Sequence, residues 1–468
     1  MEKRRGSVGM DLTEGKIFSQ LMLFVVPLLL ANLVQQLYNT VDMMVIGQYV
    51  GSAGSTGVST GGEIAGMITF IASAFGSAGQ IYVAQLFGAK DHRAISETIS
   101  TSLVFSIGLS LAATLLCVIF CDPLLRWLNC PEEAFQQAHD YMMIVSLGLP
   151  FVFGYNMVCG ILRGVGEARR PLLFITVAAV ANVVMDILLV AVIPLEAAGT
   201  AIATVAAELA SFLAAFVYLY RRREQFGITF CRREFRINGQ HLRVLLRLGI
   251  PLSVQTALIH FTLILCTREI NSYGIVAATT NSIGNRVQRM INVFASSVNQ
   301  GAGTMVGQNI GAKKYDRVRR IVGTTLLCSG VCSLVAILAA LLIPEALFSL
   351  FLKTDDPNFA AILEMGRIYM RIGCIAFALT PVQGSMQAVV TGSGNARLGM
   401  LAGLLDGLVL RLGISYFLAW TCGLGVYGFF YGNALAHLGP VAVCTAYYLS
   451  GKWITFNLLE RQGKRQKA

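Results

Sequence analysis

The chain has 468 residues, of which 55% are hydrophobic and only 13% are charged, and its mean hydropathy is +0.65. Soluble globular proteins have about a quarter of their residues charged, so this composition excludes that class and predicts a membrane protein. The net charge is +11. Most of the Lys and Arg residues that produce it lie in the connections and at the termini, so the charge does not indicate a surface that binds nucleic acid.

Apolar stretches follow one another along almost the whole chain, and each is long enough for the roughly 20 residues that a spanning helix needs. They lack the alternating polarity of barrel strands, so we predict an all-α membrane protein. Twelve transmembrane helices are expected, over residues 17–48, 54–87, 97–121, 136–162, 170–193, 197–220, 245–270, 275–310, 320–343, 362–390, 397–420 and 425–449.

Most of the 36 Lys and Arg residues fall in alternate connections between these helices and at the two termini. Connections that carry an excess of Lys and Arg stay in the cytoplasm, which predicts that both termini are cytoplasmic. The basic excess therefore indicates topology, and no nucleic-acid partner is expected. The eleven cysteines lie mostly in apolar runs without CxxC or Cys/His metal spacing, so they are interpreted as packing residues.

Three pairs of segments match at a nearly constant separation, which indicates an internal repeat. They pair "GQIYVAQLFGAKDHRAI" (79–95) with "AGTMVGQNIGAKKYDRV" (302–318), Pro27 with Pro251, and Gly164 with Gly392. Each half holds six helices, so both halves enter the membrane from the same side, as in transporters built from parallel repeats. We predict an N-lobe over 1–220, a basic cytoplasmic linker over 221–247, a C-lobe over 248–450 and a basic tail over 451–468.

The segments "PLLLANLVQQLYNTVDMMVIGQYVG", "VAQLFGAKDHRAI", "ILRGVGEARRP", "NVVMD" and "VGQNIGAKKYDRV" resemble the multidrug and toxic compound extrusion (MATE) transporters over residues 15–450. The resemblance implies two pseudo-symmetric six-helix lobes that form a V-shaped cleft. It also implies export of cationic or amphipathic compounds in exchange for H⁺ or Na⁺. A lipid-linked saccharide flippase of the same superfamily is the alternative.

Oxygen-bearing side chains occur on three helices of the first half. Asp42 ends a long uncharged stretch, Asn182 and Asp186 lie one turn apart, and Thr204 follows on the sixth helix. Carboxylate, amide and hydroxyl oxygens suit a hard cation such as Na⁺. The MATE resemblance implies that these residues, Asp42, Asn182, Asp186 and Thr204, form the cation-coupling site, although Asp42 could instead cap a helix or line a vestibule.

Two carboxylates in a low-dielectric pocket cannot both stay charged cheaply, so protonation or Na⁺ insertion should relieve them. Competition between this ion and the exported compound is the expected coupling mechanism. The second half has Leu410 and Ile414 where the first has Asn182 and Asp186. Coupling is therefore expected to depend on the N-lobe alone.

Further intramembrane polar residues fall into two groups. Those expected to line the substrate cavity are Gln35, Tyr38, Asn39, Asn156, Gln255 and His260. Those interpreted as structural charges are Glu63, Arg286, Asp406 and Arg411. Glu63 and Arg286 occupy matching places in the repeat and could pair across the cleft. Asp406 and Arg411 are five apart, about 140° around an α-helix, so they need not face one another.

The sequence has no GxxxxGK[ST] phosphate loop, so ATP is not expected to drive transport directly. No catalytic residue and no cofactor is predicted, only H⁺ or Na⁺ as the coupling ion. We therefore expect a multi-pass exporter of the bacterial inner membrane rather than an enzyme or a channel. Its partners should be small cationic or amphipathic molecules and the lipid bilayer.

Overall fold

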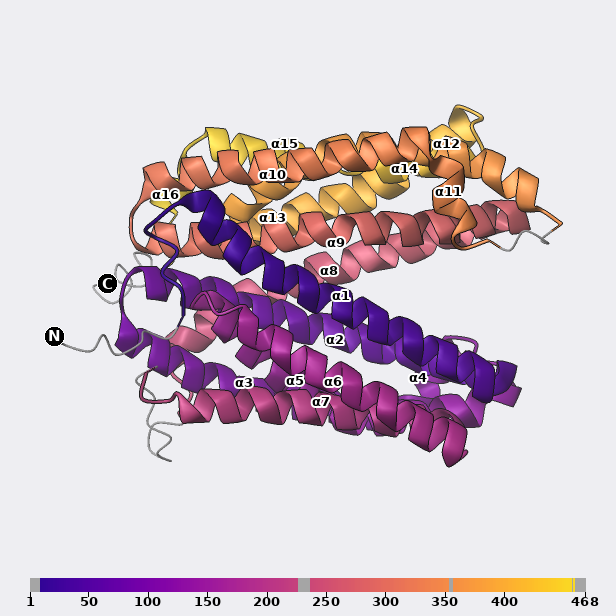
Figure 1. Cartoon of the computed structure of the whole chain (residues 1–468), viewed down its shortest axis with the longest axis horizontal. Coiled ribbons are helices and arrows are strands. Elements are labelled where there is room, and N and C mark those ends of the chain that lie inside the picture. The colour runs from indigo at the N-terminus through magenta and orange to yellow at the C-terminus, as the bar shows by residue number, and fades with distance from the viewer. Residues whose placement is uncertain (1–8, 226–235, 353–356, 457, 459–468) are drawn as a thin grey trace. The chain divides into compact units, whose positions relative to one another are not determined.

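The computed structural model describes residues 9–225, 236–352, 357–456 and 458, and all regular structure within these ranges is helical (Figure 1). Residues 226–235 of the predicted linker and 459–468 of the predicted tail lie outside the described residues. The elements are α1 Ile17–Tyr49, α2 Gly51–Gly88, α3 His92–Ile119, α4 Cys121–Trp127, α5 Glu132–Gly164, α6 Arg169–Asp186, the π-helix η1 Ile187–Val192, α7 Glu196–Arg221, α8 Gly239–Ser272, α9 Ile275–Gly311, α10 Tyr315–Leu342, α11 Pro344–Ser349, α12 Phe359–Ser393, α13 Ala396–Leu404, the π-helices η2 Leu405–Ile414 and η3 Phe417–Thr421, α14 Val426–Leu435, α15 Leu438–Leu449 and α16 Lys452–Thr455.

Each of the twelve predicted spanning segments has a helical counterpart, and the all-α prediction is confirmed. Within the described ranges, nine helical segments are long and apolar enough to cross a bilayer. The helices of the other three predicted segments, namely α9, α12 and α14 with α15, are not among these nine. The eleventh predicted segment consists of α13, η2 and η3, and the twelfth is interrupted between Leu435 and Leu438, so the last two predicted helices are not regular α-helices throughout.

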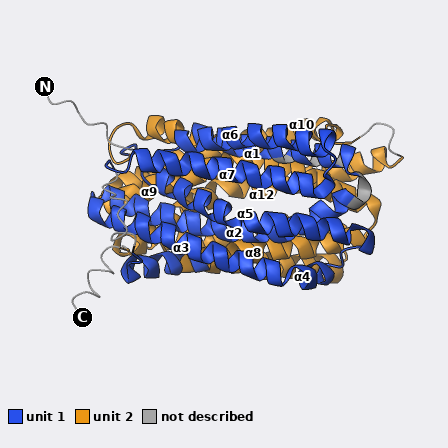
Figure 2. Ribbon diagram, turned by 90° about the horizontal axis from the view of Figure 1, so that it is seen from below, with its two compact units in different colours: residues 1–11, 26–250 blue, residues 12–25, 251–468 orange. Residues whose placement is uncertain are grey.

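The chain forms two compact units (Figure 2). Unit 1 contains Val26–Ile250 and the segment that ends at Asp11; unit 2 contains Leu12–Val25 and the chain from Pro251 onward. The change of unit therefore falls beside Pro27 in α1 and at Pro251 in α8. A proline within a helix removes one backbone hydrogen bond. In both α1 and α8, the boundary between the two units therefore lies where the helix has one hydrogen bond fewer.

In unit 1, α5 packs against α2, α3 and α7, and α6 packs against α7. Close approach of α2 and α5 depends on glycine. A Cβ at Gly160 would lie 2.1 Å from the carbonyl oxygen of Gly76, so no other residue fits there. In unit 2, α12 takes the corresponding place and packs against α9, α10, α14 and α15.

The repeated GAK loops adopt the same backbone conformation. Lys90 and Lys313 each have a φ of 59°, a left-handed conformation that is uncommon for a residue with a Cβ. The residues just before the second loop also hold Leu12, the first residue of unit 2. Leu12 N donates to Oε1 of Gln308 over 3.0 Å, and Nδ2 of Asn309 donates to the carbonyl oxygen of Leu12 over 3.1 Å.

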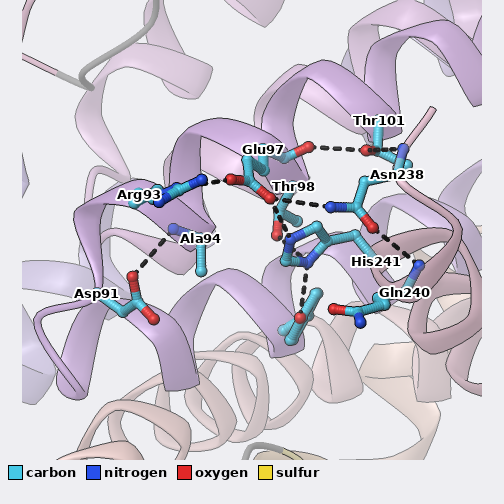
Figure 3. Close-up of polar contacts among 10 residues, drawn as sticks. Asp91, Arg93, Ala94, Glu97, Thr98, Thr101, Asn238, Gln240 and His241 are labelled. Atoms are coloured by element: carbon cyan, nitrogen blue, oxygen red, sulfur yellow. Dashed lines mark hydrogen bonds and ion pairs between the residues drawn. The ribbon is translucent and has the colours of Figure 1, made fainter. Parts of the chain in front are cut away.

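The start of α8 is anchored in unit 1 by the buried side chain of His241 (Figure 3). Its Nε2 lies 3.3 Å from a carboxylate oxygen of Glu97 and therefore donates to it. The hydroxyl groups of Tyr82 and Thr98 lie 2.8 and 3.1 Å from Nδ1. Nδ2 of Asn238 donates to the same Glu97 oxygen over 2.9 Å. These contacts join α8 to α2 and α3.

Replacement of His241 by alanine should lower the midpoint of thermal unfolding of the detergent-solubilised protein. His241 is only 6% exposed, and its loss leaves buried partners unsatisfied, at a cost of about 1 to 3 kcal/mol. The matched control is His92→Ala, because His92 is exposed at the start of α3. Equal midpoints for the two variants would show that the His241 contacts do not hold α8 in unit 1.

Candidate functional site

Asp42, Asn182, Asp186 and Thr204 lie in unit 1, on α1, α6 and α7. The carboxyl groups of Asp42 and Asp186 face one another within hydrogen-bonding range. Asp186 is 0% exposed, and Asn182, one turn earlier on the same face of α6, is also buried. The structure therefore brings together the two acids that the sequence places 144 residues apart.

Four buried oxygens of this cluster have no protein donor in the part of the chain that the structure describes. Within the described ranges, no hydrogen-bond donor reaches Oδ1 of Asp42, Oδ1 of Asn182 or either carboxylate oxygen of Asp186. Each such acceptor costs about 1 to 3 kcal/mol, and a charged one costs more. A proton on one carboxyl group, or a hard cation between them, would remove that cost. The arrangement is therefore suited to reversible binding of a small positive species.

A small cavity in unit 1 adjoins this cluster, and it has room for roughly one water-sized species. Its polar lining consists of Tyr38, Asn182, Thr204 and Glu208. Its size suits a single small ion or water molecule, and it is too small for a drug-sized molecule.

Two residues outside the predicted site also belong to this region. Glu208 lies one turn after Thr204 and lines the same cavity; the spacing of Thr200, Thr204 and Glu208 along one helix face was the available signal. Tyr141 of α5 is hydrogen-bonded to Thr204. No sequence pattern pointed to Tyr141, because α5 and α7 meet only in the folded chain.

The other predicted cavity residues of unit 1 have different surroundings. Gln35 is exposed and hydrogen-bonds to Tyr38. Asn156 is half-buried, and its Nδ2 donates to the carbonyl oxygen of Val152 in the same helix over 2.9 Å. Neither residue lines the small cavity. The side chain of Asn39 lies outside the described part of the chain.

Unit 2 contains a larger open cavity of about 170 Å³ with a neutral polar lining. Its lining residues are Asn292, Ala295, Ser296, Asn299, Thr380, Gln383, Gly384, Gln387 and His437. Gln255 instead packs against Gly399 and Gly403 of α13, and His260 is half-buried on α8. Neither is among the lining residues of this cavity, and their substrate role stays a prediction.

His437, which directly precedes α15, forms a hydrogen bond with α12. Its Nδ1 lies 2.6 Å from Oε1 of Gln383. Glu63 and Arg286, the matched charges of the repeat, are both exposed, on α2 and α9.

The expectation that Asp406 and Arg411 need not face one another was wrong. Nη2 and Nε of Arg411 donate to Oδ1 of Asp406 over 2.6 and 3.2 Å, and the pair is buried. The assumption of an α-helix caused the error, because both residues lie in the π-helix η2. In a π-helix the backbone bonds run from i to i+5, so residues five apart lie on the same side of the helix. Arg411 also donates to Asn433 of α14.

A family model described as MatE matches residues 27–188 and, a second time, residues 251–417. The chain belongs to the MATE family. Its members are membrane transporters, and the two matched ranges begin at Pro27 and Pro251. The repeat inferred from the sequence therefore corresponds to two copies of one family unit.

Curated MATE relatives cover most of the chain. The probable multidrug resistance proteins YoeA and YpnP of Bacillus subtilis strain 168 are 28% and 25% identical to it. The YoeA match covers 74% of this chain and 76% of the relative, and the YpnP match covers 96% and 98%. The multidrug export protein MepA of Staphylococcus aureus strain MRSA252 is 21% identical over 84% of this chain and 86% of its own.

Solved structures show the same fold. A structure described as the outward-facing conformation of a multidrug resistance MATE family transporter of the MOP superfamily has a TM-score of 0.86 at 20% identity, with 97% of this chain and 99% of that chain covered. A MOP superfamily transporter from Pyrococcus furiosus has a TM-score of 0.87 with the same identity and coverage. That transporter is described as having a binding pocket of reversed polarity, which suggests a different function for it. Site chemistry, not the fold, must therefore decide function.

Replacement of Asp186 by asparagine should raise the midpoint of thermal unfolding. The change removes one buried charge and supplies an amide donor for Asp42, which we expect to stabilise the protein by about 0.5 to 2 kcal/mol. Thermal unfolding in detergent is the measurement, with Asp316→Asn as the control because the Asp316 side chain is 91% exposed. A lower midpoint for Asp186→Asn would contradict the description of this carboxylate as unsatisfied.

Proposed function

We propose that this MATE transporter exports cationic or amphipathic compounds in exchange for H⁺ or Na⁺, by alternating access. The observation that carries the proposal is the pair of facing carboxylates, Asp42 and Asp186, whose buried oxygens have no donor within the described ranges. A purely structural acid in a spanning segment would be paired, as Asp406 is with Arg411.

The coupling follows from the electrostatics of this pair. With both carboxylates ionised, the site is negative and unsatisfied, and it favours a positive species of any kind. A proton or Na⁺ held between Asp42 and Asp186 neutralises it and lowers its affinity for a cationic compound. Such an ion shifts the conformational equilibrium only if its affinity differs between the two states, and rearrangement of α1 relative to α6 would provide that difference.

Two observations support cationic or amphipathic compounds as the exported substrates: the names of the relatives and the residues that line the site. Three curated relatives are named multidrug resistance or export proteins. Glu208 adds a third acid to the region of Asp42 and Asp186, which favours cationic compounds. We place the protein in the bacterial inner membrane because its curated relatives are bacterial transporters. We place its termini in the cytoplasm because most Lys and Arg residues fall in alternate connections and at the termini.

A lipid-linked saccharide is less well supported as the substrate. Its pyrophosphate would require cationic side chains, since Lys and Arg are the usual partners of phosphate oxygens. Neither the small cavity of unit 1 nor the larger cavity of unit 2 has Lys or Arg among its lining residues.

Replacement of Asp42 by asparagine should abolish gradient-driven transport. The measurement is uptake of a fluorescent cationic dye into inside-out vesicles that contain the purified protein, under an imposed H⁺ or Na⁺ gradient. Wild-type protein should accumulate dye with one of the two gradients, which identifies the coupling ion. Asp42→Asn should show at least a tenfold lower initial rate, because one carboxylate cannot exchange a proton or cation as the pair does.

The matched control is Asp316→Asn, which removes an exposed acid of α10 and should transport like the wild type. Asp42→Glu tests whether the carboxylate itself is required, and we expect it to retain part of the activity. Equal dye transport by Asp42→Asn and the control would reject the coupling role. Absence of dye transport by the wild type under either gradient would reject the cationic substrate class.

A further inference from the structure

A second group of ligand atoms lies in unit 1, on the short helix α4 and on the second turn of α5, two helices that pack against one another. Sγ of Cys121, a carboxylate oxygen of Asp122 and a ring nitrogen of His139 all lie within 4.8 Å of one another. We propose that Cys121, Asp122 and His139 bind a divalent transition-metal ion, with Zn²⁺ as the best fit.

The distances suit such an ion after small side-chain movements. Nε2 of His139 lies 3.6 Å from Oδ1 of Asp122. Zinc bonds of about 2.0 to 2.3 Å place the ligand atoms of a tetrahedral site roughly 3.2 to 3.8 Å apart. The same separation is too long for a good hydrogen bond between imidazole and carboxylate. A metal between the two groups therefore explains their spacing better than direct pairing.

The orientation of the imidazole is an independent indication. Nδ1 of His139 lies 3.4 Å from Oδ1 of Asp140, and Nε2 of Gln136 donates to that same oxygen over 3.0 Å. Histidines that bind metals almost always direct their second ring nitrogen to a carboxylate or carbonyl oxygen, which fixes the tautomer. Asp140 is placed for this positioning role, leaving Nε2 free to face Cys121 and Asp122.

The donor set selects the class of metal. A thiolate, an imidazole and a carboxylate together are typical of zinc, whereas Na⁺, Mg²⁺ and Ca²⁺ take oxygen ligands. Cys121 is 2% exposed, while the side chains of His139 and Asp122 are 33% and 53% exposed. An ion can therefore enter from solvent, and a water molecule can complete four-coordination.

Unit 2 offers an internal comparison, because α11 precedes α12 as α4 precedes α5. There Glu345 of α11 forms an ion pair with Arg367 of α12. A permanent positive charge thus links the short helix to the long one in unit 2. In unit 1 the acid, Asp122, faces a histidine and a thiol instead of an arginine, and these groups can share a metal ion where unit 2 has a direct ion pair. The site would tie α4 to α5 in a metal-dependent way.

The experiment titrates the purified full-length protein, stripped with a chelator, with Co²⁺ and then Zn²⁺. We expect one equivalent of Co²⁺ to give the intense thiolate-to-cobalt charge-transfer absorption, and Zn²⁺ to displace it. Cys121→Ser should lose this absorption, and His139→Gln should weaken binding at least tenfold. Asp140→Asn keeps all three ligands and should weaken binding about 10- to 100-fold.

Two matched variants separate this site from other thiols and from the proposed coupling site. Cys130→Ser removes a neighbouring, half-buried thiol that is not part of the cluster, and Asp186→Asn removes a coupling acid; both should bind Co²⁺ like the wild type. Binding without the thiolate absorption, or equal binding by wild type and Cys121→Ser, would overturn the proposal. If Cys121→Ser fails to fold, unchanged affinity in Asp140→Asn and His139→Gln would overturn it equally.

Discussion

A spanning helix satisfies its backbone but leaves every polar side chain to find a partner without bulk water, and this constraint decides where the charges of the protein lie. Asp406 is paired with Arg411 and buried. Glu97 and His241 share a hydrogen-bonded network at the start of α8. Asp42 and Asp186 differ from both, because their buried oxygens face one another without donors within the described ranges. A proton or a small cation bound between Asp42 and Asp186 would supply the partner that their oxygens lack. For this reason the function is assigned to this pair of acids.

The two halves repeat the backbone while their side chains differ. The family match begins at Pro27 and again at Pro251, and the GAK loops share a left-handed lysine. Yet the acids that characterise the unit 1 site have no counterparts at the matching positions of unit 2, whose cavity has a neutral polar lining. Duplication therefore conserved helix positions and turn geometry, which packing fixes, and left the polar side chains to diverge toward separate tasks.

Stability and function make opposite demands at the acidic pair. A carboxylate with no donor lowers the stability of the fold, but it is also what makes a bound proton or cation favourable. The His241 network shows the other outcome, in which each polar group has a partner and the contact stabilises the protein. Sites that must gain and lose a ligand are left incomplete, whereas sites that hold elements together are not.

The sequence by itself determined the membrane class, the twelve helical segments, the repeat and the shared face of Asn182 and Asp186. These follow from hydropathy and from spacing along one helix, which are local properties. Only the tertiary structure brought Asp42 to Asp186, placed Glu208 and Tyr141 beside them, and gathered Cys121, Asp122 and His139 from two helices. It also paired Asp406 with Arg411, because the local winding there is a π-helix. Contacts between helices depend on how their faces pack, and spacing within one helix carries no information about that packing.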